Sequence, residues 1–201
     1  MCVQMKQKLT YMATKTNTEL ILKVMHVLTW VAFIGLLIDA GTYVFSYFIS
    51  LYQAEAAGQL SDGLNIQDLR QHAGDRGYNL KVLMYFDLWH YTLVMSSLAA
   101  LSGAKAWMSW IIIRTLSHVR LSQPFTTEVA NGIEKVSYTL LIACAIASMH
   151  NAHSDWLGKH ADIAVATAAT GEYLFTAGLV FILAQVFKRG VELQSESELT
   201  V

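Results

Sequence analysis

Four long apolar stretches divide the chain, and each is long enough to form a helix that crosses a lipid bilayer. They run over about 24–51, 82–113, 136–157 and 163–187. A bilayer core about 30 Å thick requires roughly 20 apolar residues in a helix, which satisfies its own backbone hydrogen bonds. The third stretch reaches this length only if His150 and His153 lie within the outer edge of the membrane. The pattern predicts an all-α integral membrane protein, a four-helix bundle with four spans.

The charged residues between these stretches predict how the helices are oriented. Lys and Arg concentrate in the amino-terminal segment, in the middle connection and at the carboxyl end, and the two other connections hold fewer of them. By the positive-inside rule, the richer set faces the cytoplasm. We therefore expect a single membrane domain over 1–201 in a bacterial cytoplasmic (inner) membrane, with both termini inside, a mobile tail over 1–18 and a second tail over 188–201. Thr16 and Glu19 have capping-box spacing, which predicts the start of the first helix.

The middle connection contains the single proline of the chain, Pro124. The residue before a proline is disfavoured in helical geometry, so the second helix is expected to end before it, near Val119. Thr126 can cap the next helix, and Glu128 suits its first turn. Apolar residues then recur at helical spacing at Val129, Ile133, Val136 and Leu140. The second and third helices are thus predicted to extend into the cytoplasm as a hairpin that is a candidate docking surface.

Small residues four positions apart allow helices to approach closely in lipid. Such pairs are Ala99 with Gly103, Ala143 with Ala147 and Ala164 with Ala168. Packing within the bundle and formation of a homodimer both use this spacing, and the sequence leaves both open.

Composition narrows the classes of function further. Hydrophobic residues make up 54% of the chain and charged residues 14%, and the formal net charge is −1, which argues against direct binding of nucleic acid. Two cysteines cannot form a disulfide framework or a cysteine zinc site. The sequence contains no nucleophile elbow and no phosphate-binding glycine loop. It therefore offers no motif for a particular reaction, and an enzyme is the least favoured class.

Two segments carry a resemblance to a known family. The turn Gln123-Pro124-Phe125-Thr126, which an acidic residue follows closely, and the carboxyl end from Glu172 through Lys188-Arg189-Gly190 to Leu199-Thr200-Val201 resemble the bacterial DUF2975 membrane proteins. That resemblance implies four spans and, because such proteins are often encoded beside a small helix-turn-helix regulator, a cytoplasmic DNA-binding partner. The residues that it singles out as a docking motif are Pro124, Phe125, Thr126, Lys188, Arg189, Gly190, Glu192, Leu193, Leu199 and Thr200.

Ionisable residues inside the predicted spans form the second candidate site, because such residues are costly in lipid and commonly functional. At about 1.5 Å of rise per residue, six of them fall in the outer half of the bundle: Asp39, Asp87, His90, His150, His153 and Glu172. Three interpretations stay open. The cluster is a pH- or ligand-responsive switch, or a divalent metal site formed by Asp87, His90, His150 and His153, or a set of structural hydrogen bonds and interfacial groups.

No cofactor is predicted from this cluster, and a haem held between His90 and His150 is the least favoured of its uses. We therefore expect a regulatory or sensory membrane protein that acts with a cytoplasmic helix-turn-helix regulator. The alternative is a small oligomeric transporter or channel that uses the same acid and histidine residues as its pathway.

Overall fold

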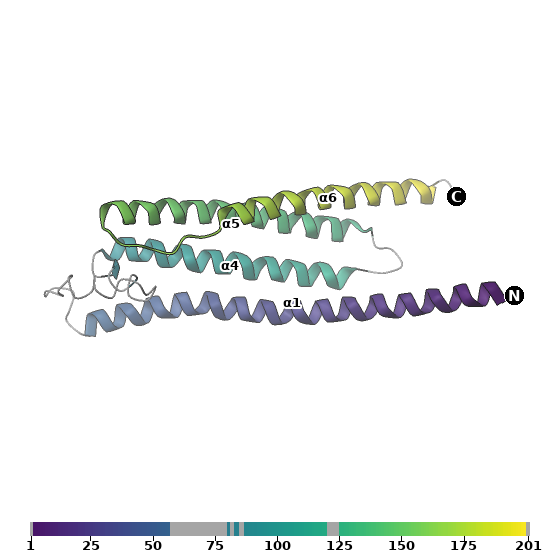
Figure 1. Ribbon diagram of the computed structural model, residues 1–201, viewed down its shortest axis with the longest axis horizontal. Helices are drawn as coiled ribbons and strands as arrows, with labels where there is room; N and C mark the ends of the chain where they lie inside the picture. The colour runs from purple at the N-terminus through teal and green to yellow at the C-terminus, as the bar shows by residue number, and fades with distance from the viewer. Residues whose placement is uncertain (1, 57–79, 81–82, 85–86, 120–124, 200–201) are drawn as a thin grey trace.

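A computed structural model shows four long helices that run side by side (Figure 1). The structure describes residues 2–56, 80, 83–84, 87–119 and 125–199. In chain order the helices are α1 (Cys2–Ala56), α4 (Leu88–His118), α5 (Thr127–His160) and α6 (Thr170–Leu199). Within these residues there is no strand, so the predicted all-α class is confirmed.

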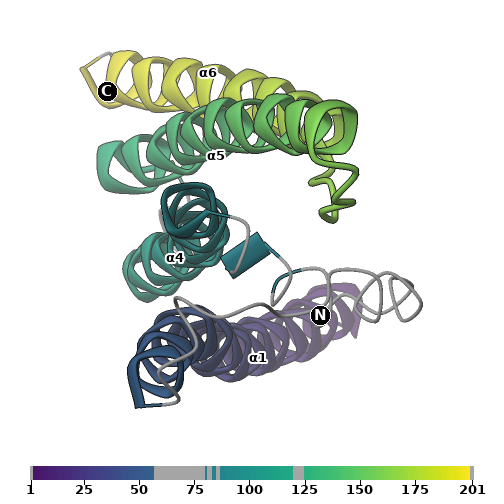
Figure 2. The ribbon, with the colours of Figure 1, turned by 90° about the vertical axis from the view of Figure 1, so that its left-hand side faces the viewer.

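The helices pack in a row in the order of the chain. α1 contacts α4, α4 contacts α5 and α5 contacts α6, and among the described residues no other pair of these helices packs together. Figure 2 shows this row, with α1 at one edge and α6 at the other. The arrangement is therefore more open than the closed four-helix bundle that the sequence suggests, because α1 and α6 do not meet.

The beginnings of α1 and α5 and the ends of α4 and α6 lie at the same end of the row (Figure 1). We call this the terminal end, and it includes residues 125–128 and 188–199. The opposite end includes residues 87–90 and 153–163.

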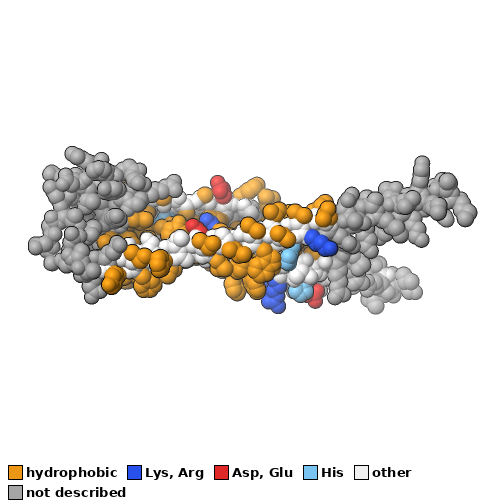
Figure 3. Space-filling view, turned by 90° about the horizontal axis from the view of Figure 1, so that it is seen from below, with side chains coloured by type: hydrophobic (Ala, Val, Ile, Leu, Met, Phe, Trp, Pro, Cys, Tyr) orange, Lys and Arg blue, Asp and Glu red, His pale blue; other side chains and the backbone are white. Residues whose placement is uncertain are grey.

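Three of the helices are long and apolar enough to cross a membrane: Leu20–Tyr52 of α1, α5, and Thr170–Ser197 of α6. In the α1 segment no residue of the most apolar window is fully buried, and residues such as Phe45 and Phe48 are more than 60% exposed. In Figure 3, hydrophobic side chains lie over much of the middle of the molecule, the part that the view colours by residue type. Exposed apolar helices of this length are stable when lipid surrounds them. The protein is therefore a membrane protein.

The helix α4 is not among these three, although the sequence predicts a span over 82–113. It lies between α1 and α5 and directs Ser102 and Ser109 into these contacts, where both are buried. These two serines therefore meet neighbouring helices rather than lipid. The helix itself begins at Leu88, because Asp87 caps it by accepting a hydrogen bond from the Trp89 backbone N–H at 2.9 Å.

Other predicted helix ends are partly correct. Thr126 caps α5 and accepts from the Val129 backbone N–H at 3.4 Å, and α4 ends at His118, as expected. The first helix begins at Cys2 and not near Thr16, so the capping-box spacing of Thr16 and Glu19 does not mark its start, and residues 2–18 are helical. No glycine or proline precedes Gly35, so no strong helix breaker stops the helix earlier. Pro124 lies outside the described residues.

The largest difference from the prediction lies between α5 and α6. The chain leaves α5 at Ala161, passes through Asp162 with a φ of 55°, and returns along α5 without helical structure until Thr170. The predicted span over 163–187 therefore begins seven residues too early, and Ala164 and Ala168 do not share a helix face. The interactions that hold this returning segment are described below.

The helices α4 and α5 approach closely at Gly132. A Cβ atom there would lie 2.1 Å from the Thr115 hydroxyl oxygen, so only glycine allows this separation of the two helices. Ala143 and Ala147, one of the small-residue pairs, are buried in the same interface farther along α5.

We expect Gly132→Ala to lower the midpoint of thermal unfolding in detergent, because the added methyl group must push the two helices apart. Gly103→Ala is the matched control, since nothing lies within 4 Å of a Cβ at that position; it should leave the midpoint unchanged or raise it. Thr115→Ala should restore much of the loss when it is combined with Gly132→Ala. Equal midpoints for both single variants would contradict the close contact.

Candidate functional site

The segment 163–169 lies against α5 and receives its hydrogen bonds from polar side chains of that helix. Asn151 donates to the Ala168 carbonyl at 2.8 Å and accepts from the Ala168 backbone N–H at 2.7 Å. Ser154 donates to the Val165 carbonyl at 2.8 Å. Non-helical backbone at membrane depth is tolerated only where protein or water supplies such partners. These side chains are therefore what makes the segment possible.

His150 belongs to the same set and also joins it to α4. Its side chain is 3% exposed. The Nε2 atom donates to the Ala166 carbonyl at 2.9 Å, and the Nδ1 atom lies 2.7 Å from the Ser97 hydroxyl oxygen. A serine within hydrogen-bond reach of a histidine is one requirement for a nucleophile and its base. Here, however, the imidazole is buried with both nitrogens engaged, so the pair connects α4, α5 and the segment 163–169.

A second polar group lies at the opposite end of the row. Asp87 and His90 form a pair, with Oδ2 and Nδ1 separated by 2.6 Å. The His90 ring stacks on His153 and on Trp156, with centroid distances of 5.3 and 5.0 Å. The pKa of the Asp87 carboxyl, which precedes α4, is lowered by the hydrogen bond from the Trp89 backbone N–H and then by the bond with His90.

His153 belongs to the same group, and its ring also stacks on Trp156, with a centroid distance of 6.3 Å. Its Nε2 atom is buried and, among the described residues, has no hydrogen-bond partner. Trp156 also stacks on His160, with a centroid distance of 4.7 Å. We call Asp87, His90, His153, Trp156 and His160 the stacked group. It combines three imidazoles, one indole and one carboxylate at the opposite end.

The remaining two candidates lie elsewhere. Asp39 on α1 accepts a hydrogen bond from Ser102 on α4 at 2.6 Å. Glu172 is exposed in the first turn of α6, where the positive end of the helix dipole favours an acid. The six predicted residues are thus divided among four places, and the structure does not bring them into one site.

This division bears on the metal and haem interpretations. In the described part of the chain, no three His, Cys, Asp or Glu residues form a group suited to a metal ion. His150 was a candidate ligand for both metal and haem, and its two ring nitrogens are engaged by Ser97 and Ala166. The geometry around this histidine fits the structural interpretation.

The terminal end holds the residues that the family resemblance singles out. The Phe125 ring lies against Phe187, with a centroid distance of 5.4 Å, and against Gly190, where a Cβ would lie 2.6 Å from the ring. Beside it, Lys188 on α6 pairs with Glu134 on α5 at 2.7 Å. We call these five residues the terminal clamp. They bring the two separate sequence motifs into contact.

Beyond the clamp, α6 continues as a helix to Leu199. Arg189 pairs with Glu192 at 2.6 Å on its exposed surface, and Leu193 is 52% exposed. The pattern predicts a short acidic tail here, and the structure gives it a helical form. Thr200 lies outside the described residues.

Sequence reasoning missed most of the partners of the predicted residues. Asn151 and Ser154 lie one and four positions after His150, so all three share one side of α5, a spacing that could have indicated a polar stripe. Their partners are backbone atoms, which carry no sequence signature. Nothing in the sequence distinguishes Ser97 and Ser102 from the other serines of the chain. Their hydrogen bonds to His150 and Asp39 follow from how α4 packs against α5 and α1.

We expect Asn151→Leu to destabilise the protein, because it leaves the N–H and the carbonyl of Ala168 without partners. Each unsatisfied group costs about 1–3 kcal/mol. Thermal unfolding in detergent measures the effect, and Asn131→Leu, at an exposed position of the same helix, is the matched control. If both variants unfold at the same temperature as the original chain, Asn151 does not hold the segment 163–169.

Comparison with known proteins addresses the family and no more. A family model described as "Protein of unknown function (DUF2975)" matches residues 79–201. Searches of curated proteins and of solved structures find no match to the chain. The matched region is more than half of the chain and contains α4, α5, α6 and the whole terminal clamp. The chain therefore belongs to the DUF2975 family.

Proposed function

We propose that this protein is a regulatory or sensory membrane protein whose terminal end binds a cytoplasmic partner, a helix-turn-helix regulator. In this proposal all four helices cross a bacterial cytoplasmic membrane, and both termini and the connection between α4 and α5 lie in the cytoplasm. The single observation that carries it is the terminal clamp, which fixes the end of α6 against the turn before α5.

The clamp supports docking because it produces a defined surface from two distant segments. Phe125 and Gly190 are in van der Waals contact, so the helix that follows Gly190 leaves the clamp in one direction. From Val191 to Leu199 it extends about 12 Å farther. A rigid projecting helix presents side chains to a partner at a lower entropic cost than a disordered tail.

The composition of this helix indicates the chemistry of the partner. Its acidic residues Glu192, Glu196 and Glu198 favour a partner with a basic surface, which DNA-binding domains carry. Leu193 adds an exposed apolar contact. A regulator bound here through its basic surface could not bind DNA at the same time. In this proposal the membrane protein therefore inhibits DNA binding by the regulator.

The input side of the proposal is the stacked group at the opposite end. It has three histidines close to one carboxylate, and histidine changes its charge near physiological pH. Because α5 runs from His153 to the residues beside Phe125, a shift of this helix would be felt at the terminal clamp. The transport alternative has no comparable support, since Asp39 and His150 are engaged in bonds between elements.

We expect the terminal end to be accessible from the cytoplasm alone. In a chain with Cys2 and Cys144 replaced by serine, cysteines introduced by Thr127→Cys or Glu196→Cys should react with a membrane-impermeant maleimide only after intact cells are opened. Lys159→Cys, at the opposite end, should react in intact cells. Labelling of residue 127 or 196 from outside would overturn the cytoplasmic docking proposal.

We expect the intact protein to co-purify with a helix-turn-helix regulator, and a chain that ends after Arg189 to lose this binding. Gly190→Leu should weaken binding at least several-fold, because its side chain would collide with the Phe125 ring and displace the end of α6. Affinity is measured with the purified regulator and the detergent-solubilised protein.

Gly171→Ala provides the matched control, because nothing lies within 4 Å of a Cβ at that position of the same helix. It should bind the regulator as the original chain does. Absence of binding by the intact chain would refute the partner, and unchanged binding by Gly190→Leu would refute the role of the clamp.

A further inference from the structure

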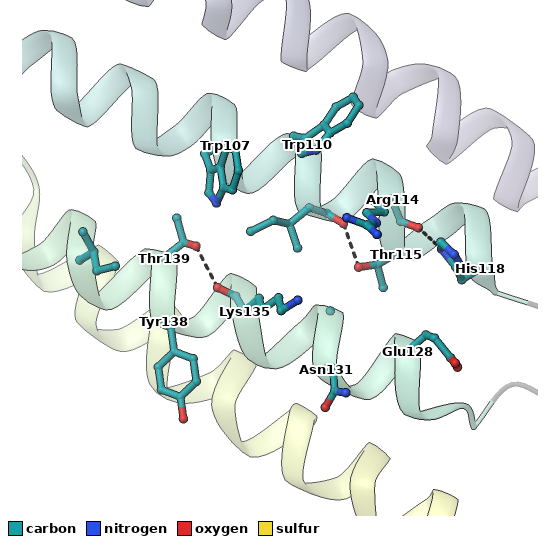
Figure 4. A pocket seen from close by; sticks show the side chains of 13 residues that line it. Trp107, Trp110, Arg114, Thr115, His118, Glu128, Asn131, Lys135, Tyr138 and Thr139 are labelled. Carbon is teal, nitrogen blue, oxygen red and sulfur yellow. Dashed lines mark hydrogen bonds between the residues drawn. The ribbon is translucent and has the colours of Figure 1, made fainter.

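A groove of about 530 Å³ lies between α4 and α5 in the half of the row near the terminal end. Figure 4 shows its two sides: Trp107, Trp110 and Arg114 come from α4, and Lys135 and Thr139 come from α5. The contact between Gly132 and Thr115 lies within the lining and brings the helices together there. The groove is not part of the terminal clamp or of the stacked group.

The lining is polar at one end and apolar at the other. Toward the terminal end it contains Arg114 and His118 of α4 and Glu128, Asn131 and Lys135 of α5. Toward the middle of the molecule it contains Trp107, Ile111, Tyr138 and Ile142. From Glu128 to Lys135 the helix rises about 10 Å, and from Lys135 to Ile142 about 10 Å more. The order of polar and apolar residues is the same on both helices.

Positive charge dominates the polar part. Arg114 and Lys135 extend into the space between α4 and α5 (Figure 4), and neither forms an ion pair with a described residue. Glu128 is the one acidic residue among the lining residues. An Arg and a Lys that share an amphipathic groove offer a bidentate donor and a point charge, the combination that binds a phosphate.

The apolar part restricts what can fill the groove. Trp107 is 61% exposed and Ile142 is 59% exposed, and Ile142 belongs to a helix that can cross a membrane. A soluble anion or an acidic peptide would leave this apolar part uncovered. A molecule with a phosphate at one end and a hydrocarbon chain at the other would cover both parts, and tryptophan commonly lies where headgroups and chains meet.

We infer that this groove binds an anionic phospholipid, with its phosphate between Arg114 and Lys135 and an acyl chain along Trp107 and Ile142. Basic pockets between membrane helices recognise anionic headgroups by this charge pairing. The inference stands apart from the proposed docking function, because none of its residues belongs to the terminal clamp. In this inference a lipid, and not the partner protein, occupies the groove.

The experiment uses the full-length protein in detergent with added phosphatidylglycerol or phosphatidylcholine, and native mass spectrometry counts the lipids that stay bound. We expect one tightly retained phosphatidylglycerol per chain and much weaker retention of phosphatidylcholine. A cation near a phosphate contributes about 5-fold in affinity, so Arg114→Gln with Lys135→Gln should weaken phosphatidylglycerol retention about 25-fold.

Two further variants make the result specific. Lys159→Gln removes an exposed cation at the opposite end of the same helix and should leave retention unchanged. Arg114→Lys with Lys135→Arg keeps both charges and should retain the lipid, which separates loss of charge from loss of folding. Retention by the double glutamine variant equal to that of the original chain would overturn the inference, as would equal retention of the two lipids.

Inorganic phosphate distinguishes a lipid from a soluble ligand. If the apolar part contributes to binding, 20-fold molar excess of phosphate over the lipid should leave phosphatidylglycerol bound. Displacement of the lipid by phosphate alone would show that the groove recognises a soluble phosphate, and the lipid inference would then be wrong.

Discussion

The backbone of residues 163–169 must find hydrogen-bond partners outside a helix, and the position of α6 depends on how α5 provides them. His150, Asn151 and Ser154 bind four of its polar atoms, the carbonyls of Val165, Ala166 and Ala168 and the N–H of Ala168. The nine residues 161–169 return along α5 from His160 to the level of Cys144, where Thr170 begins the next helix. That return covers about 24 Å, whereas nine helical residues would cover about 14 Å. The extended form therefore places α6 about 10 Å closer to the terminal end.

This displacement is what aligns the two family motifs. Gly190 lies 20 residues into α6, and Phe125 lies 19 residues before Cys144, so the two meet only because α6 starts beside Cys144. Had a helix continued from residue 163, Gly190 would lie near Ile133, and Glu192 would lie beside α5 instead of beyond it. Polar residues in the middle of α5 thus determine how far α6 projects at the other end of the row.

Periodicity and caps predicted the elements that depend on their own residues, and the structure confirms these: the all-α class, the Thr126 cap and the end of α4 near Val119. The predictions are wrong where a segment's conformation depends on contacts with another helix. The segment 163–169 is apolar and short of helix breakers, so its sequence alone favours a helix, and only the side chains of α5 allow the extended form. The six ionisable candidates share a predicted depth in the membrane. Depth does not say which helix face a residue occupies. For this reason the prediction groups Asp39 and Glu172 with residues that they do not contact.

The helix α5 carries the terminal clamp and the proposed lipid groove on different faces. Glu134 pairs with Lys188 of α6, and the next residue, Lys135, lines the groove beside α4. Adjacent residues on a helix point about 100° apart, so a lipid in the groove contacts α4 and α5 without touching α6. Its binding energy would therefore act on the separation of α4 and α5, which the Gly132–Thr115 contact limits. Since Phe125 precedes α5 and packs on α6, a change in this separation reaches the clamp through the position of α5.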